Sequence, residues 1–600
     1  MPADPEHVVA VDRDDPTKAA ADDDRPRWAA FPSYQRERER AGRKDQQDES
    51  YDTTRQFKQG FEDNLWLVTK HIERRRARLD KLDVTPSPEV VRRVVAAIPD
   101  PLPDEGALGD TMHYLMQRFL PGCLPAQNGP RYFGFVTGGT TDAAQLADLL
   151  VTSYDENVQV TLPDTSASTA LEGRALEWVL DLLGIPRDVF VGRTITTGAT
   201  ASNVLGLACA REHLYATASN TPDGYSFAEY GPPARGHQDP PIVIVALEPH
   251  FSIRKAAALV GIGSRSFLDV KASASNPLAF DLDDLARLLN RPKDDPTRTI
   301  VSYGLGEVNT GGFGRDLRKV ATLCKRYGAW LHVDAAFGGF AHCVPELKHL
   351  TDGIELANSL TLDGHKWLNI PYDCGLFFTS TSQNLKAFLG PPEDLRPAYL
   401  SAGPDKGLEK YPSEHEDIPS PLYVGIENSR RFRALPLFAS LMTYGWKGYR
   451  HFVRMNVHFA RQLAELINVH PSYELLNRQP GYTGNSGNRA YTGWSDYDAS
   501  DRRVPIIPLN IVLFRGSESS PYHSPDNDNG IVKLIDALNG SRKLYVSGTR
   551  YRNRGAIRIA ISNWLTWKEE DFNIVKTVLE EVAGIVVVPD TPSPRRSAFK

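Results

Sequence analysis

One stretch of the sequence, residues 361–368, reads TLDGHKWL and follows an apolar run that is typical of a buried strand. Lys366 therefore lies in otherwise apolar surroundings. Burial removes part of a lysine's preference for its charged form, and the neutral amine is a nucleophile for carbonyl carbons. Taken by itself, an exposed lysine beside a chance histidine is the commoner arrangement. Residues that follow the neighbouring predicted strands provide the evidence that distinguishes these two interpretations.

The region from about 126 to 390 alternates short β-branched runs with amphipathic helical stretches. Such alternation predicts a mostly parallel sheet covered by helices. The predicted strands are Thr194–Thr196, Ile242–Ala246, Thr299–Tyr303, Trp330–Val333 and Leu376–Phe378, and helices are predicted at Leu282–Leu289 and Leu317–Tyr327. Ligands bind at the carboxyl ends of the strands in sheets of this kind, so reactive residues are expected directly after the apolar runs.

Residues 332–339, HVDAAFGG, place Asp334 at the end of one predicted strand. The small residues that follow leave room for a flat ring, and the carboxylate can hold a pyridine nitrogen in its protonated form. The competing interpretation is a turn or helix-capping aspartate, which is common.

Residues 196–203, TTGATASN, follow another predicted strand and open a helix. Gly198 and Ala199 let an anion approach the backbone, and the helix N-terminus with the Thr200 hydroxyl would bind a phosphate. Many strand-to-helix turns have a similar composition. This one does not match the nucleotide-binding pattern G-x-x-x-x-G-K-[ST].

His250 follows the predicted strand Ile242–Ala246 within the segment Glu-Pro-His-Phe-Ser. An imidazole at the carboxyl end of a strand can lie flat against a cofactor ring. A lone histidine is at least as often a packed or an exposed residue, so this position decides nothing alone.

Together the four segments offer a phosphate cradle, a stacking imidazole, a carboxylate for a pyridinium nitrogen and a lysine for a Schiff base. Pyridoxal 5′-phosphate needs all four, because the protein must anchor, orient and electronically tune it, and we predict this cofactor. The same segments resemble the group II pyridoxal-phosphate-dependent amino-acid decarboxylases, which include aromatic-amino-acid, glutamate and histidine decarboxylases. The resemblance covers roughly residues 60–585 and is most specific at His365-Lys366-Trp367 and at 332–336.

The resemblance implies a role for each matching position. Lys366 would carry the cofactor as a Schiff base, and His250, stacked on the pyridine ring, and Tyr399 would be the other catalytic residues. The remaining cofactor-binding positions would be Ala199, Thr200 and His365 at the phosphate, Asp334 at the ring nitrogen, Ala336 beneath the ring, and Asn309 or its neighbour Thr310 at the phenolic oxygen.

Tyr399 belongs to residues 397–400, PAYL, which resemble the mobile loop of this family. The tyrosine of that loop donates a proton to the α-carbon of the substrate, so the resemblance makes Tyr399 the donor. The alternative for this residue is an aromatic side chain on a surface loop.

The chain departs from the family pattern at three places. It reads GEVNTG at 306–311, where members usually carry a Gly-Thr-Thr run, and it has Ala201 where they have a glutamate after the phosphate cradle. Residues 135–140, FVTGGT, lack the sequence of the aromatic-amino-acid enzymes near the substrate wall. Because residues 135–140 lie near the substrate wall, this last departure leaves the identity of the substrate open.

The fold that the resemblance implies is α/β, of the pyridoxal-phosphate-dependent transferase type (fold type I). It would have a large domain with a mostly parallel sheet, a smaller C-terminal α/β domain and a helical N-terminal arm. The expected boundaries are a disordered arm at 1–55, a helical segment at 56–125, the cofactor-binding large domain at 126–425, the small domain at 426–590 and a tail at 591–600. In the last third of the chain we expect a helix at Ala434–Ile467, strands at Ile506–Phe514 and Ile557–Ile561, a helix near Asp571–Val582, and a surface loop at Asn477–Arg503.

The stretch Gln56–Ile98 has a helical pattern, with Phe61, Leu65, Val68 and Ile72 on one face. This apolar face needs a cover. In the resembling family the arm wraps a partner and both subunits contribute to each active site, so we expect a homodimer.

Composition sets wider limits. The chain has 600 residues, of which 41% are hydrophobic and 24% charged, which is typical of globular proteins and too long for one core. A net charge of −6 gives no reason to expect nucleic-acid binding, and no apolar run approaches the length of a membrane span. The five scattered cysteines form no C-x-x-C pair; we predict no metal site and expect a reducing compartment, the cytoplasm.

The expected activity is that of a carboxy-lyase that converts an L-amino acid, aromatic by preference and acidic next, to the amine and CO2. Two alternatives remain open. One is another pyridoxal-phosphate reaction on the same fold, such as decarboxylation-coupled aldehyde synthesis or carbon–carbon cleavage, and the other is a non-catalytic binding protein that has kept the fold.

Overall fold

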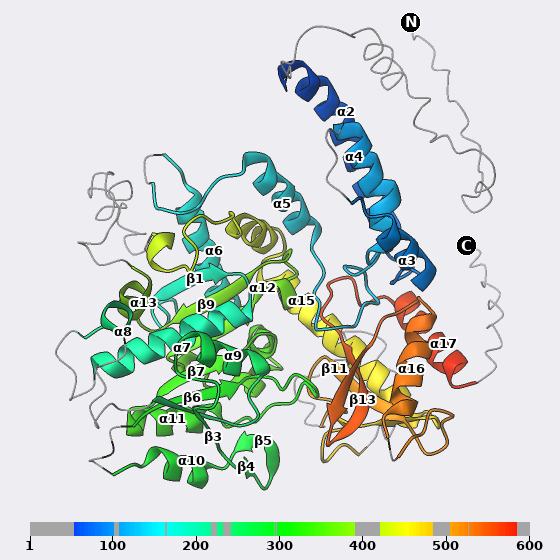
Figure 1. Ribbon diagram of the computed structural model, residues 1–600. Helices are drawn as coiled ribbons and strands as arrows, with labels where there is room; N and C mark the ends of the chain where they lie inside the picture. Colours follow the sequence, from blue (N-terminus) through cyan, green and yellow to red (C-terminus); the bar gives the residue numbers. More distant parts are fainter. Residues whose placement is uncertain are drawn as a thin grey trace, which may run out of the picture. The chain divides into compact units, whose positions relative to one another are not determined.

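Figure 1 shows the computed structural model of the chain, which describes residues 53–100, 107–162, 165–217, 225–231, 242–292, 295, 297–390, 420–483, 504–525 and 527–584. The chain divides into two compact units. One is formed by Met1–Lys70 with Gly106–Met112, and the other by His71–Glu105 with His113–Lys600.

The first unit holds most of helix α2 (Thr53–Ala77) and the beginning of α4 (Leu108–Tyr114). The helix predicted around Phe61 and Leu65 is therefore confirmed. Both side chains, and Trp66 beside them, keep more than half of their surface exposed in the described part of the chain.

The helical pattern predicted for 56–98 is divided in the structure, because α2 ends at Ala77 and α3 (Pro88–Ala96) is a separate helix. Ser87 caps α3 by accepting a hydrogen bond from the backbone N–H of Val90. Pro88 occupies the first turn, where its missing N–H is not needed. A proline in mid-helix would break the backbone ladder, so α2 cannot continue through this point.

A seven-stranded sheet forms the centre of the second unit (Figure 1). Its order is β1 (Gly192–Thr196), β9 (Gly375–Thr379), β8 (Ser359–Asp363), β7 (Trp330–Asp334), β6 (Arg298–Gly304), β2 (Ile242–Ala246) and β3 (Phe267–Asp269). The strands from β8 to β3 are parallel, whereas β9 runs antiparallel to both of its neighbours. The five predicted strands are confirmed, each within one or two residues at its ends, and the mostly parallel sheet is confirmed with them.

Both faces of this sheet are buried, as side-chain alternation requires for a sheet between two helical layers. Ile244 of β2 and Ile300 of β6 pack with α7 (Ala199–Ala216) and α9 (Phe251–Leu259). The next residue of each strand, Val245 and Val301, lies in the other core with α10 (Leu282–Leu289) and α11 (Leu317–Tyr327). The bounds predicted for the last two helices agree with the structure.

Further helices and short elements complete the second unit. They are η2 (Leu115–Phe119), η3 (Leu120–Gly122), α5 (Asp142–Tyr154), α6 (Ser168–Leu183), α8 (Phe227–Tyr230), η4 (Gly338–Cys343), η5 (Lys348–Thr351), η6 (Ile354–Leu356), α12 (Gly364–Trp367), α13 (Ser382–Leu389), η9 (Pro421–Tyr423) and the hairpin β4 (Ala272–Ser273) with β5 (Asn276–Phe280).

The C-terminal part of this unit is built on α15 (Ala434–Val469) and a second, antiparallel sheet. The sheet has the order β10 (Tyr473–Leu475), β11 (Ile511–Gly516), β13 (Arg554–Ala560) and β12 (Ser547–Tyr551), with α16 (Asn529–Gly540) and α17 (Glu569–Val582) packed against it. Helix α15 contributes apolar side chains to both large cores, with those up to Val457 in one core and those from Phe459 onward in the other. It is interrupted at Gly445, whose φ of 54° is open to glycine without a steric penalty.

One predicted strand begins later than expected. The strand predicted at Ile506–Phe514 begins only at Ile511. Pro505 and Pro508 have no backbone N–H for a sheet ladder, and the Asn510 side chain bonds to the Ile561 carbonyl instead. The helices predicted at Ala434–Ile467 and near Asp571–Val582 are confirmed as α15 and α17. Most of the predicted loop Asn477–Arg503 lies outside the described residues.

None of the described helices combines the length and the apolar character that crossing a membrane requires.

Candidate active site

The strand register brings the predicted segments to one edge of the large sheet. Asp363, the last residue of β8, is paired with Gly375 of β9, which is paired in turn with Thr196 at the end of β1. On its other side β8 pairs with β7, whose last residue, Asp334, lies opposite Thr361. The phosphate-cradle segment, the Asp334 segment and the Lys366 segment therefore meet at this edge, as expected for a sheet of this class.

Lys366 lies on the short helix α12, directly after β8. Its Nζ is 3.0 Å from Oδ2 of Asp363, and a fifth of its side-chain surface is exposed. The next residue, Trp367, is fully buried and donates from Nε1 to Asn456. The lysine thus sits at a solvent-accessible point of an otherwise buried segment. A Cβ at Gly138 would come within 1.6 Å of the Lys366 carbonyl oxygen, so only glycine fits there.

Asp363 is a site residue that the sequence analysis did not single out. Its side chain is buried, and Oδ1 accepts a 2.6 Å hydrogen bond from the backbone N–H of Ala199 at the start of α7. The N-cap residue of this helix, Gly198, has no side chain to cap it, and the Asp363 carboxylate bonds to the helix end instead. Asp363 therefore joins the N-terminus of α7 to Lys366, through one oxygen for each.

His365 lies beside Asp363 as well. Its Nε2 lies 3.5 Å from Oδ1 of Asp363, and its ring packs on Tyr372 with centroids 4.5 Å apart. A Cβ at Gly198 would be only 3.2 Å from the His365 ring. Burial lowers the pKa of His365, with the Asp363 charge acting in the opposite direction, so the imidazole is uncharged near pH 7.

Asp334 is held by donors. Its Oδ2 accepts from the Asn203 side chain at 2.9 Å, and its Oδ1 accepts from the backbone N–H of Ala336 at 3.2 Å. His250 caps helix α9, and its Nδ1 contacts the Ser252 hydroxyl at 2.7 Å. Ser252 is in turn bonded to Asn203, so Asn203 links the predicted carboxylate to the predicted stacking histidine.

The side chains of Asn309 and Thr310 form hydrogen bonds with residues other than the predicted site residues. Asn309 Oδ1 accepts from Thr549 of β12 at 2.6 Å, and Thr310 Oγ1 donates to Glu307 at 2.7 Å. Their contacts in the described part of the chain do not include Lys366 or Asp334. The role predicted for Asn309 at the phenolic oxygen stays a prediction.

Arg558 on β13 is a second residue that the sequence analysis did not single out. Its Nε donates to the carbonyl oxygen of Val308 at 2.6 Å, in the loop after β6. The side chain is buried, and its Nη2 finds no hydrogen-bond partner within the described ranges. Burial lowers the pKa of this guanidinium to about 10, against the stabilising charge of Glu307. An arginine inside the apolar run AIRIAI was the signal that could have identified it.

Tyr399 lies outside the described residues, and its predicted role stays a prediction. Thr200 and Ala336 are half-buried at the carboxyl edge, next to Ala199 and Asp334 respectively. The described side chains include no group of three or more His, Cys, Asp and Glu residues that could hold a metal ion.

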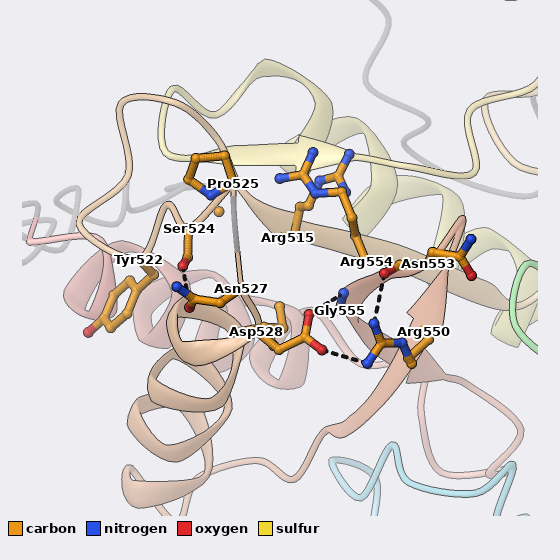
Figure 2. A pocket seen from close by; sticks show the side chains of 12 residues that line it. Arg515, Tyr522, Ser524, Pro525, Asn527, Asp528, Arg550, Asn553, Arg554 and Gly555 are labelled. Carbon is orange, nitrogen blue, oxygen red and sulfur yellow. Dashed lines mark hydrogen bonds and ion pairs between the residues drawn. The ribbon is translucent and has the colours of Figure 1, made fainter.

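A cavity of about 180 Å³ lies in the C-terminal part of the chain, and none of the predicted site residues lines it (Figure 2). Two of its arginines have carboxylate partners: Arg515 bonds to Glu474, and Arg550 bonds to Asp528 at 2.8 Å. The internal pairing of these charges explains Arg515 and Arg550 without a ligand.

The conserved domain of the pyridoxal-dependent decarboxylases matches residues 93–483 of the chain. The chain belongs to this family. Among its relatives, this decarboxylase is 26% identical over 502 residues to phenylacetaldehyde synthase of Rosa hybrid cultivar, with 80% of this chain and 85% of that protein covered. It is also 26% identical over 463 residues to tryptophan decarboxylase 1 of Oryza sativa subsp. japonica, with 76% and 80% covered.

The fold of the decarboxylase is that of solved family members. The crystal structure of Oryza sativa TDC with PLP and tryptamine superposes with a TM-score of 0.68 at 21% identity, covering 90% of this chain and all of that one. The α/β fold type I architecture expected from the sequence is confirmed. Family membership also makes the protein a pyridoxal-phosphate-dependent carboxy-lyase acting on an amino acid.

The geometry at the sheet edge fits pyridoxal 5′-phosphate with one exception. The N-cap residue of helix α7 is Gly198, which has no side chain and leaves room beside His365 that a Cβ would fill. A helix N-terminus that begins at a glycine lets a phosphate approach its backbone N–H groups. The exception is Asp363, a carboxylate bonded to the same helix N-terminus, where a second negative charge would repel the phosphate.

We expect Asp363→Asn to favour the phosphate. The amide keeps an acceptor for the Ala199 N–H and removes the charge. The ratio of affinities for pyridoxal 5′-phosphate and for pyridoxal should rise about tenfold, the equivalent of ~1.4 kcal/mol. Loss of the ion pair with Lys366 affects both ligands alike, so the ratio isolates the phosphate.

Fluorescence titration of the cofactor-free protein measures both affinities. Asp284→Asn is the matched control, because Asp284 is also buried and accepts a backbone N–H, from Lys271. An unchanged ratio in Asp363→Asn would show that this carboxylate does not face the phosphate.

Proposed function

We propose that the protein converts an aromatic L-amino acid to its amine and CO2, with Lys366 as the residue that binds the cofactor. The arrangement around Asp363 supports the proposal most directly. One carboxylate contacts both the Lys366 amine at 3.0 Å and the Ala199 N–H at the start of α7 at 2.6 Å. The amine that would react with the cofactor's aldehyde and the helix end that would bind its phosphate are thus neighbours.

Bound pyridoxal 5′-phosphate would supply an electron sink for the pair of electrons left when the C–CO2 bond of the substrate breaks. In this proposal Asp334 holds a proton on the ring nitrogen, since the bonds that its carboxylate accepts within the described ranges come from the Asn203 amide and the Ala336 backbone N–H, which are uncharged. His250 lies against the ring, and Ala199, Thr200 and His365 surround the phosphate. Ala336 packs beneath the ring, and Asn309 reaches the phenolic oxygen.

Two relatives support an aromatic substrate, because one acts on tryptophan by name and the other forms phenylacetaldehyde. The likeness to phenylacetaldehyde synthase also keeps decarboxylation-coupled aldehyde synthesis as the second candidate function. The two outcomes differ in what reacts at the α-carbon after CO2 leaves. A proton gives the amine, whereas dioxygen takes up two electrons to give peroxide and an imine, which water hydrolyses to the aldehyde and ammonia. We favour the amine because Tyr399 offers a phenolic proton in the segment that resembles the family's loop.

We further propose a homodimer in the cytoplasm. The exposed apolar side chains Phe61, Leu65 and Trp66 on α2 support a partner subunit. All five cysteines are free thiols, which suits a reducing compartment.

Product stoichiometry on a panel of amino acids tests the proposed reaction. The panel comprises tryptophan, tyrosine, phenylalanine, histidine, glutamate and 2,4-diaminobutyrate, each assayed for CO2, amine, aldehyde and ammonia. We expect an aromatic member to be fastest, with amine and CO2 in equal amounts. Aldehyde and ammonia in amounts equal to CO2 would establish the second candidate function, and release of no CO2 from any member would refute both.

Tyr399→Phe tests the proton donor. Positioned general acids contribute roughly 10²–10⁴-fold, so we expect amine formation to slow by at least about a hundredfold. The aldehyde fraction per CO2 should rise in air and not under nitrogen, because only dioxygen can supply the oxidising equivalents. Tyr423→Phe is the matched control. An unchanged amine-to-CO2 ratio with an unchanged rate would remove Tyr399 from the mechanism.

A further inference from the structure

A chain of buried polar side chains runs through the core of the large sheet to Asp334. Trp330 Nε1 bonds to Ser359 Oγ at 3.0 Å, Ser359 Oγ to His332 Nδ1 at 2.8 Å, and His332 Nε2 to Asn203 Oδ1 at 2.9 Å. The Asn203 amide nitrogen then contacts Asp334 Oδ2 at 2.9 Å and Ser252 Oγ at 3.0 Å. His332, Ser359 and Asn203 are fully buried.

The secondary structure brings these hydrogen-bonded side chains together. His332 and Asp334 are two residues apart on β7, so both side chains point to the face covered by α7. Asn203 and Gly206 are three residues apart on α7 and share the helix face turned to them. A Cβ at Gly206 would lie 2.4 Å from the His332 ring, so the glycine admits the imidazole between strand and helix.

The direction of each hydrogen bond follows from the two fixed ends. The Trp330 indole can only donate, and the Asp334 carboxylate only accepts. Asn203 must therefore turn its NH2 to Asp334 and its oxygen to His332. In the reverse orientation the amide oxygen would lie against the Asp334 carboxylate, and neither group could donate. His332 Nε2 must then donate.

The pKa of His332 agrees with this assignment. Burial lowers it to about 4, against the Asp334 charge, so the ring is neutral and carries only one proton. With that proton on Nε2, the Nδ1 atom is an acceptor for the Ser359 hydroxyl. Every donor is then matched with an acceptor in the series of hydrogen bonds from Trp330 to Asp334.

The second N–H of Asn203 supports one tautomer of His250. Because it donates to Ser252 Oγ, the Ser252 hydroxyl is free to donate to His250 Nδ1 at 2.7 Å. The Ser252 backbone N–H points to the same Nδ1 at 3.2 Å. With two donors at Nδ1, a neutral His250 must carry its proton on Nε2.

We propose that Asn203 is a positioning residue that sets the orientation of the Asp334 carboxylate and supports the tautomer of His250 through Ser252, and that His332 holds it in place. The proposal builds on the proposed function, in which Asp334 faces the cofactor's ring nitrogen and His250 its ring face. Asn203 itself reaches both only through its two amide hydrogens. Its loss should therefore weaken the interaction with the ring nitrogen specifically.

The test compares pyridoxal 5′-phosphate with its 1-deaza analogue, in which a C–H replaces the ring nitrogen. Binding of each to the cofactor-free protein is measured by fluorescence titration. The wild type should prefer the natural cofactor. Asn203→Ala and His332→Phe should reduce that preference by about tenfold, and affinity for the analogue should change by less than about threefold, because the phosphate and lysine contacts remain.

Rescue and control variants separate positioning from folding. His332→Gln places an amide donor near the position of Nε2 and should recover part of the preference. His342→Phe is the matched control, because His342 is also buried and neutral and bonds to the Thr351 hydroxyl, away from Asp334. It should keep the full preference.

The outcomes are distinct. If both ligands weaken equally in Asn203→Ala and in His332→Phe, Asn203 is only a structural residue and the proposal fails. If the wild type shows no preference, Asp334 does not face the ring nitrogen, and the proposal fails with it. If the wild type binds neither ligand, the proposed function itself is wrong. Should Asn203→Ala not fold, His332→Phe and His332→Gln carry the same comparison without touching Asn203.

Discussion

The central sheet is buried on both faces, and this constraint decides where polar chemistry can be placed. Its strands carry isoleucine, valine, leucine and phenylalanine at successive positions, each facing one of two helical layers. A charged side chain inside such a strand would lose its solvation without compensation. Charges therefore collect where the strands end, and Asp334 and Asp363 are the last residues of adjacent strands.

The two carboxylates have opposite environments despite their closeness in the sheet. Asp334 accepts from an amide side chain and a backbone N–H, and its hydrogen-bond partners in the described part of the chain include no cation. Asp363 is paired with an ammonium group and with the N-terminus of α7. In the proposed function, this difference would suit Asp334 to a cationic ring nitrogen and would suit Asp363 to ordering the lysine beside the phosphate. His332, a polar side chain within a buried strand, is tolerated because both of its nitrogens are satisfied.

Much of this arrangement was readable from the sequence. The strand runs and helix faces gave the sheet, and Lys366, Asp334 and the 196–203 segment fell at strand ends, where the fold class places ligands. The connections between them were not readable. Ala199 and Asp363 are 164 positions apart, and Asn203 and Asp334 are 131 apart, so no local pattern predicts either bond.

The errors have physical causes of the same kind. The helical pattern at 56–98 did not register that Pro86 and Pro88 prevent one helix from spanning the segment. The strand at 506–514 did not register the missing donors of Pro505 and Pro508. Arg558 was overlooked because its burial depends on the loop after β6, far away in the sequence.

Reduction with borohydride, followed by peptide mapping by mass spectrometry, tests the central claim that Lys366 is the cofactor-binding lysine of this edge. The protein is loaded with pyridoxal 5′-phosphate, reduced and digested. The account requires the phosphopyridoxyl group on the peptide that contains Lys366, and no label on that peptide in Lys366→Ala. Stoichiometric label on a different lysine of the wild type would contradict it.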